Sequence, residues 1–125
     1  MDKQLSVTAS EWHIMELLWE APQTLMEMVG KLSDSAGWSK STVTTMIRRM
    51  TEKGLIVYEE HGRTKTFRAA VSREDVVERE TDTLLDRAFS GSLGMMLSAM
   101  VQHKKLSKGD IDELYAILKQ AEEDA

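Results

Sequence analysis

Hydroxyl and guanidinium side chains dominate residues 41–49, where the sequence reads Ser-Thr-Val-Thr-Thr-Met-Ile-Arg-Arg. Hydroxyls can bond to phosphate oxygens or to base edges, and the fork of an arginine matches the two hydrogen-bond acceptors of guanine. These residue types therefore suit the reading of a DNA groove. The candidate contact residues are Ser39, Ser41, Thr42, Thr44, Thr45, Arg48 and Arg49.

A helix over residues 38–53 is needed to present these side chains together. On a helical wheel Ser41, Thr45 and Arg48 form one face, and an apolar stripe forms the opposite face. The simpler alternative is a solvated surface helix, because many exposed helix faces are charged. Ser39 is a suitable N-cap and Gly54 a suitable C-cap, so both ends are marked. The apolar stripe consists of Val43, Met46, Ile47 and Met50.

Two further helices are predicted ahead of this one. Thr8 and Glu11 have the spacing of a capping box, and the same spacing recurs at Thr24. Trp12 and Trp19 are expected in the core, because tryptophan buries a large apolar area. The expected elements are a helix over residues 9–20, a helix over residues 25–32 and a turn over residues 33–37.

A β-hairpin is predicted after the third helix. Residues 55–60 and 65–70 are rich in strand-forming residues, and residues 61–64 have the composition of a turn. Three helices followed by such a hairpin form a winged helix-turn-helix, in which the hairpin is the wing. The alternative is a hairpin that only covers the edge of the core, but this does not explain why bases cluster on it. Arg63, Lys65 and Arg68 are expected at or just beyond its tip, facing the sugar-phosphate backbone.

Charge is divided unevenly along the chain. The 125 residues carry a net charge of −5, which by itself argues against a nucleic-acid partner. Residues 39–68, however, hold seven bases and three acids, a local charge of +4, whereas residues 71–125 hold seven bases and twelve acids. Phosphate binding depends on the field of one face rather than on the total charge. The acidic half is therefore expected to point away from DNA.

The sequence lacks the residues that several classes of function require. The chain has no cysteine, and His13, His61 and His103 are far apart, so no metal site is expected. We find no nucleophile elbow, phosphate loop or paired carboxylates, and we expect no catalytic residue and no cofactor. No apolar run is long enough to span a bilayer and the N-terminus lacks a signal-peptide core, so we expect a cytoplasmic protein.

The second half of the chain predicts helices without basic faces. They cover residues 72–89, 93–102 and 108–120, and we expect two domains, residues 1–71 and 72–125. Their apolar residues exceed what one small bundle needs, which favours a homodimer over a closed monomeric bundle. Two reading helices on two half-sites also multiply specificity. The candidate dimerisation residues are Leu84, Leu85, Phe89, Leu93, Met96, Leu97, Met100, Ile111, Leu114, Tyr115 and Leu118.

Four stretches together resemble a known family. They are Ala9-Ser10-Glu11-Trp12 through Leu18-Trp19, Ser41-Thr42-Val43 through Arg49, Lys53-Gly54-Leu55-Ile56, and Leu106-Ser107 to Asp112-Glu113-Leu114. In these stretches the chain is similar to the BlaI/MecI/CopY repressors, the winged-helix repressors of β-lactamase, methicillin-resistance and copper-export genes. The resemblance covers nearly the whole chain and implies a dimeric repressor of transcription.

The resemblance also bears on how such a repressor is released from DNA. In the β-lactamase branch, a protease linked to a sensor cuts an Asn-Phe bond in the dimerisation helices. The corresponding bond here falls near Ala99 and Met100, and neither family residue is present. The copper branch uses a C-terminal cysteine motif, which this chain lacks.

We therefore expect a mainly α-helical protein that binds double-stranded operator DNA as a homodimer. As a repressor it would control β-lactam, cell-wall or other stress genes. The alternative is a winged-helix module that binds a partner protein and has an incidental basic face. Steep salt dependence of DNA binding would distinguish the two, because phosphate contacts release counterions.

Overall fold

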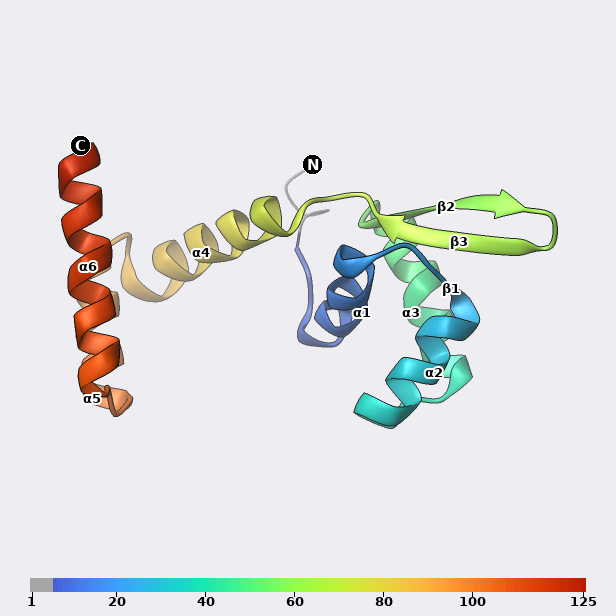
Figure 1. The fold of residues 1–125 in the computed structure, drawn as a ribbon, viewed down its shortest axis with the longest axis horizontal. Coiled ribbons are helices and arrows are strands. Elements are labelled where there is room, and N and C mark those ends of the chain that lie inside the picture. The colour runs from blue at the N-terminus through green and yellow to red at the C-terminus, as the bar shows by residue number, and fades with distance from the viewer. Residues whose placement is uncertain (1–5) are drawn as a thin grey trace. The chain divides into compact units, whose positions relative to one another are not determined.

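The computed structural model describes residues 6–125, which form two compact units (Figure 1). The first unit ends at Asp82 and the second is Thr83–Ala125. The described elements are α1 (Ala9–Glu20), β1 (Gln23–Thr24), α2 (Leu25–Ala36), α3 (Lys40–Lys53), β2 (Ile56–His61), β3 (Thr64–Ala69), α4 (Arg73–Phe89), α5 (Leu93–His103) and α6 (Lys108–Asp124).

Capping residues determine where most helices begin. Thr8 and Thr24 each accept a hydrogen bond from the third backbone amide of the following helix, and a glutamate returns the bond in both cases. Ser107 forms the same box with Asp110 at the start of α6. Each box satisfies two backbone donors that have no partner within the helix. The capping predicted at Thr8 and Thr24 is confirmed.

The expected turn over residues 33–37 is wrong for its first four residues. α2 continues through Ala36, and Gly37 follows in the left-handed region with a φ of 68°. The Gly37 N–H donates to the carbonyl of Ser33, and the Trp38 N–H donates to that of Leu32. These bonds satisfy the last carbonyls of the helix, so small polar residues can extend it up to the glycine.

A third strand was not predicted. β1 pairs antiparallel with β3, which also pairs with β2, so the strand order is β1-β3-β2. β1 has only two residues, too few to show alternation in the sequence. Gln23 lies in this strand, is buried, and donates through Nε2 to the carbonyl of Leu17 at 2.7 Å. The strand thereby joins the connection between α1 and α2 to the hairpin.

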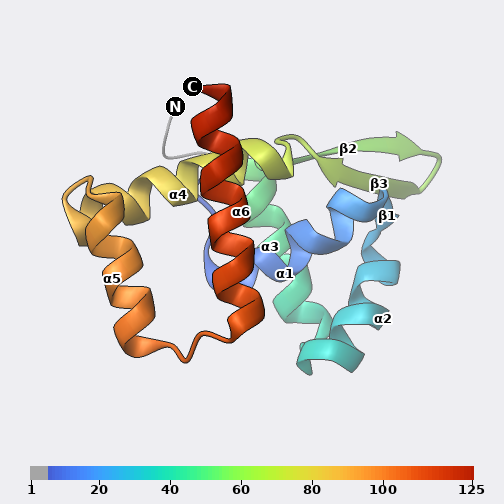
Figure 2. The same ribbon diagram turned by 60° about the vertical axis from the view of Figure 1, so that its left-hand side comes forward.

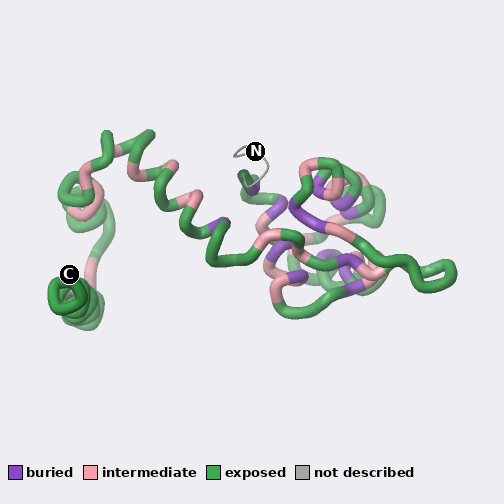
Figure 3. Tube along the Cα trace, turned by 90° about the horizontal axis from the view of Figure 1, so that it is seen from above, coloured by how far each residue is buried: buried purple, intermediate pink, exposed green. Residues whose placement is uncertain are grey.

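The core of the first unit lies between its three helices and the base of the hairpin, and Figure 3 shows buried residues concentrated in this unit. Trp12 and Trp19 pack against the core half-buried, with their rings edge to face at 5.4 Å. The fully buried side chains include Ile14, Met15, Met28, Leu32, Val43, Met50, Leu55, Ile56 and Val76.

The start of α4 is fixed to the first unit. Trp19 Nε1 donates to the carbonyl of Val71 at 3.0 Å, and the Arg73 guanidinium lies 5.3 Å from the Trp19 ring centre. Arg73 also contacts Glu16 at 3.4 Å, and Val76 is completely buried. Because of these contacts, the first compact unit extends beyond residue 71, where the sequence suggested a domain boundary.

The second unit contains the end of α4 together with α5 and α6. α5 and α6 run in opposite directions and are joined by residues 104–107 (Figure 2). Neither α5 nor α6 has a buried residue, although both carry large apolar side chains. None of the helices in the described part of the chain has both the length and the hydropathy needed to cross a membrane. The prediction that the N-terminus lacks a signal-peptide core concerns in part residues 1–5, which lie outside the described residues.

Two glycines provide a matched test of the end of α3. Gly54 has a φ of 85°, whereas Gly30 lies inside α2, and an added Cβ would meet no atom within 4 Å at either site. Gly54→Ala should destabilise the protein by about 1–2 kcal/mol, because an L-residue is strained in the left-handed region. Gly30→Ala should stabilise it by about 0.5–1 kcal/mol.

Urea unfolding of both variants beside the wild type measures these two effects. Shifts of the midpoint in opposite directions are expected. A midpoint for Gly54→Ala equal to or above that of the wild type would contradict this account of the cap.

Candidate nucleic-acid interface

α3 separates its side chains into a buried face and an exposed face. Val43, Ile47 and Met50 are buried, and Met46 is half-buried against the core. The exposed residues on the other side are Ser41, Thr42, Thr44, Arg48 and Arg49, while Thr45 is half-buried. The structure therefore brings the predicted contact residues of α3 together on one helix, with Thr45 less accessible than its neighbours.

The hydroxyl groups at the start of α3 differ in their bonding. Ser39 accepts a hydrogen bond from the Thr42 N–H at 3.2 Å and donates to Thr42 Oγ1 at 3.1 Å. Thr44 donates to the carbonyl of Lys40 at 2.8 Å, which leaves its oxygen free to accept. Ser41 and Thr45 make no side-chain hydrogen bond within the described residues. The predicted N-cap at Ser39 and C-cap at Gly54 are confirmed.

The two arginines of α3 are held loosely. Arg48 Nη1 lies 3.9 Å from Glu52 Oε1, and both side chains are more than half exposed. Such a surface pair contributes at most about 1 kcal/mol, so a base edge or phosphate can replace the carboxylate. Arg49 is exposed and forms no ion pair in the described part of the chain. Both guanidinium groups are therefore available to a polyanion.

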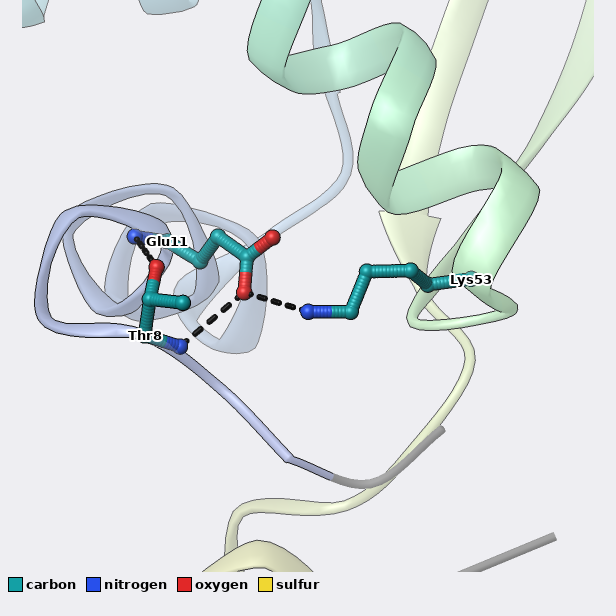
Figure 4. A network of polar contacts seen from close by, with 3 residues as sticks. All are labelled: Thr8, Glu11 and Lys53. Carbon is teal, nitrogen blue, oxygen red and sulfur yellow. Dashed lines mark hydrogen bonds and ion pairs between the residues drawn. The ribbon is translucent and has the colours of Figure 1, made fainter. Parts of the chain in front are cut away.

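A partly buried ion pair fixes the C-terminal end of α3. Lys53 Nζ lies 2.7 Å from Glu11 Oε1, which also accepts the backbone N–H of Thr8 at 2.9 Å (Figure 4). Glu11 is only 6% exposed, so its charge requires these partners. The contact joins the first turn of α1 to the last turn of α3. The sequence marked Glu11 only as part of a capping box.

The partners of Glu11 determine its ionisation. Burial by itself raises the pKa of the Glu11 carboxyl, but the Lys53 ammonium and the Thr8 backbone N–H stabilise the charged form. The net effect holds this pKa below its ordinary value of 4.5. Glu11 is therefore ionised at neutral pH.

The three predicted bases of the wing lie at different distances from its turn. Gly62 and Arg63 form the two-residue turn, since His61 pairs with Thr64, and Gly62 has a φ of 67°. A positive φ at the first central residue is typical of a type II′ turn. The expectation that Arg68 lies at or just beyond the tip is wrong. Antiparallel register sets it opposite Val57, near the base of the wing.

The local contacts of the wing bases differ as well. Arg68 Nε lies 3.9 Å from Glu59 Oε1, so Arg68 is partly neutralised. Lys65 Nζ lies 4.5 Å from the ring centre of Tyr58. Neither Arg63 nor Lys65 forms an ion pair with another described residue. The positive potential of the wing therefore comes mainly from its outer half.

A groove of about 700 Å³ separates α3 from the wing. Sequence reasoning identified its basic residues but missed Thr24, Met26 and Tyr58, which also line it. Met26 lies on α2 beside its buried stripe and is 59% exposed. The described residues include no cluster of three histidines, cysteines or carboxylates suited to a metal ion.

Three packed helices, an exposed polar and basic third helix and a hairpin wing define a winged helix-turn-helix DNA-binding domain. The sequence model of the penicillinase repressor family matches residues 7–120. The chain therefore belongs to the penicillinase repressor family. It is a DNA-binding repressor of that family and not an enzyme.

Individual relatives agree with this assignment. The penicillinase repressor of Bacillus licheniformis is 27% identical over 121 residues, which cover 96% of this chain and 94% of that protein. The methicillin resistance regulatory protein MecI of Mammaliicoccus sciuri is 21% identical over 118 residues, 94% of this chain and 96% of the relative. The solution structure of the DNA-binding domain of the repressor BlaI matches with a TM-score of 0.54 at 25% identity, covering 60% of this chain and 93% of that domain.

Replacing Lys53 tests whether the ion pair holds the unit together. Lys53→Met leaves the buried Glu11 carboxylate with fewer partners, which should cost about 1–3 kcal/mol at neutral pH and lower Tm by several degrees. The ionised Glu11 stabilises the wild type above its ordinary pKa of 4.5, and this contribution is lost as the pH falls through the lowered folded-state pKa. The Tm of Lys53→Met should therefore depend less on pH than that of the wild type as the pH falls below 4.5.

Thermal unfolding followed by circular dichroism from acid to neutral pH measures both effects. Lys40→Met, at the exposed other end of α3, is the control for removing one lysine. If Lys53→Met and Lys40→Met have the same Tm at neutral pH, the ion pair does not stabilise the unit.

Proposed function

We propose that the protein represses transcription by binding as a homodimer to an inverted repeat that overlaps a promoter. The observation that carries this proposal is the exposed face of α3 beside a wing with two bases that lack a carboxylate partner among the described residues. Two such faces, one from each copy, would occupy successive major grooves on one side of the duplex. Occupation of a promoter in this way excludes the transcription machinery.

We assign the residues of α3 to two roles, contacts with base edges and contacts with phosphates. Ser41, Thr44, Thr45 and Arg48 are assigned to base edges, with Arg48 donating to a guanine through both arms of its fork. Arg49 and Thr42 flank this set and are assigned to phosphates. Ser39 belongs to the same interface, because it lies at the N-terminus of the helix, where backbone amides favour phosphate oxygens.

The wing residues are assigned to the sugar-phosphate backbone. Arg63 at the turn and Lys65 beside it have no carboxylate partner within the described chain and extend from the hairpin. Arg68 lies nearer the base and must leave Glu59 to contact a phosphate. We therefore expect Arg63 and Lys65 to contribute more than Arg68.

The exposed apolar side chains of α4, α5 and α6 support the homodimer. Leu84, Leu93 and Leu118 are each more than half exposed, and Tyr115 is 71% exposed. In an isolated chain these apolar side chains are exposed to water, whereas in a homodimer the same surface of a second copy covers them. The proposed interface residues are Leu84, Leu85, Phe89, Leu93, Met96, Leu97, Met100, Ile111, Leu114, Tyr115 and Leu118.

Derepression is proposed to follow cleavage in α5 near Ala99 and Met100 by a sensor-linked protease. Both residues lie inside the helix, with Ala99 half-buried and Met100 37% exposed. A protease binds its substrate extended, so α5 must unwind locally before cleavage. Cells treated with a cell-wall antibiotic should contain a fragment ending near Ala99 on an immunoblot. Derepressed genes beside an intact chain would contradict this route.

Arg48 and Lys65 should differ in what their removal does to DNA binding. Arg48→Ala should reduce the preference for operator over scrambled DNA by about 1–3 kcal/mol, because a bidentate base contact is lost. Arg48→Lys, which keeps the charge but not the fork, should lose most of the same preference. Lys65→Ala should weaken binding to both sequences and reduce the salt slope by about one.

Fluorescence anisotropy titrations of both duplexes at several salt concentrations separate these effects. Equal affinity of the wild type for operator and scrambled DNA would contradict sequence-specific repression. A binding constant that does not depend on salt would instead favour a protein-interaction module.

Leu118 provides a test of the dimer. Leu118→Glu adds a charge to the proposed apolar interface and should convert the dimer to monomers at micromolar concentration. Gln120→Glu adds the same charge two residues further along α6 and should leave the dimer intact. Sedimentation velocity measures both masses, and a monomeric wild type would contradict the proposed interface.

A further inference from the structure

The groove between α3 and the wing combines an apolar floor with a basic rim. Its volume of about 700 Å³ is within the usual range of small-molecule sites. It lies entirely within the first compact unit. The apolar lining comes from Leu25, Met26, Ile47, Tyr58 and Phe67.

The floor of the groove is aromatic and partly exposed. The rings of Tyr58 and Phe67 lie 5.5 Å apart at a tilt of 53°. Tyr58 is 40% exposed and Met26 is 59% exposed, so water covers a surface that a flat apolar group could cover instead. Phosphate contacts require cations but no such floor.

The rim supplies more positive than negative charge. Arg48, Arg63 and Lys65 line the groove together with one carboxylate, that of Glu52. The Lys65 ammonium is already positioned against the Tyr58 ring, 4.5 Å from its centre. An anionic group bound at this rim would lie within reach of a cation while its apolar body covers the ring.

We propose that this groove binds a small amphipathic carboxylate, with a flat apolar body on Tyr58 and Met26 and its carboxylate toward Lys65 and Arg63. The groove includes Thr44, Arg48, Arg63 and Lys65, which the proposed function assigns to DNA. The ligand and DNA therefore exclude each other, and this consequence rests on the proposed function. Such a ligand releases the repressor from DNA without cleavage of the chain.

Methionine methyl groups report binding at this groove separately from binding elsewhere. The full-length protein, labelled with ¹³C at its methionine methyls, is titrated with 2-naphthoate and with the neutral 2-naphthamide. Met26→Leu assigns the resonance in the groove, and Met95, exposed outside the groove, is the internal control. Saturable shifts of the Met26 resonance with naphthoate, and much smaller shifts with naphthamide, are expected.

Charge removal at the rim tests the orientation of the ligand. The double variant Arg63→Gln and Lys65→Gln should weaken naphthoate binding by about tenfold, since an ionic contact is lost. Arg87→Gln removes an exposed arginine outside the groove and should leave the affinity unchanged. The proposal fails if the Met26 resonance does not shift, if both probes bind equally, or if the double variant binds naphthoate as tightly as the wild type.

Competition with DNA separates this inference from the proposed function. Naphthoate should displace a labelled duplex with an apparent affinity equal to that measured at Met26. Binding at Met26 without displacement would overturn the mutual exclusion. If the protein binds no DNA at all, the proposed function fails, while the methionine titration still decides whether the groove is a ligand site.

Discussion

The ion pair between Lys53 and Glu11 links α3 to the rest of the first unit. It joins the last turn of α3 to the first turn of α1, 42 residues earlier in the sequence, at a separation of 2.7 Å. Glu11 serves at the same time as the acidic member of the α1 capping box. One carboxylate therefore determines where α1 begins and holds the far end of α3. The exposed face of α3 keeps its orientation because the opposite face and this end are both anchored.

The two units differ in how much of their apolar surface is buried. The first unit buries a core between three helices and a hairpin and exposes polar and basic groups on one side of α3. The second unit buries no residue of α5 or α6 and exposes leucines, methionines and Tyr115. The homodimer proposed above covers the exposed apolar side chains of the second unit, and the proposed DNA contacts use the polar and basic face of the first unit.

Local signals in the sequence were sufficient for most elements of the first unit. Thr8, Thr24 and Ser39 mark helix starts because capping depends on neighbours in the chain. β1 and the pairing of Lys53 with Glu11 could not be predicted, because both depend on contacts between distant segments. Arg68 was misplaced because hairpin register depends on the turn, which begins at Gly62. The groove was missed for a similar reason, since Met26 and Tyr58 are distant in the sequence and line one groove only in the fold.

The central claim is that α3 and the wing read a two-fold operator as a pair. A hydroxyl-radical footprint on the promoter upstream of the gene for this protein tests it most directly. Two protected patches are expected on one face of the duplex, centred about one helical turn, or a multiple of it, apart. They should be related by inverted symmetry, and Arg48→Ala should weaken both. A single protected patch, or uniform protection that is the same on any sequence, would contradict the account.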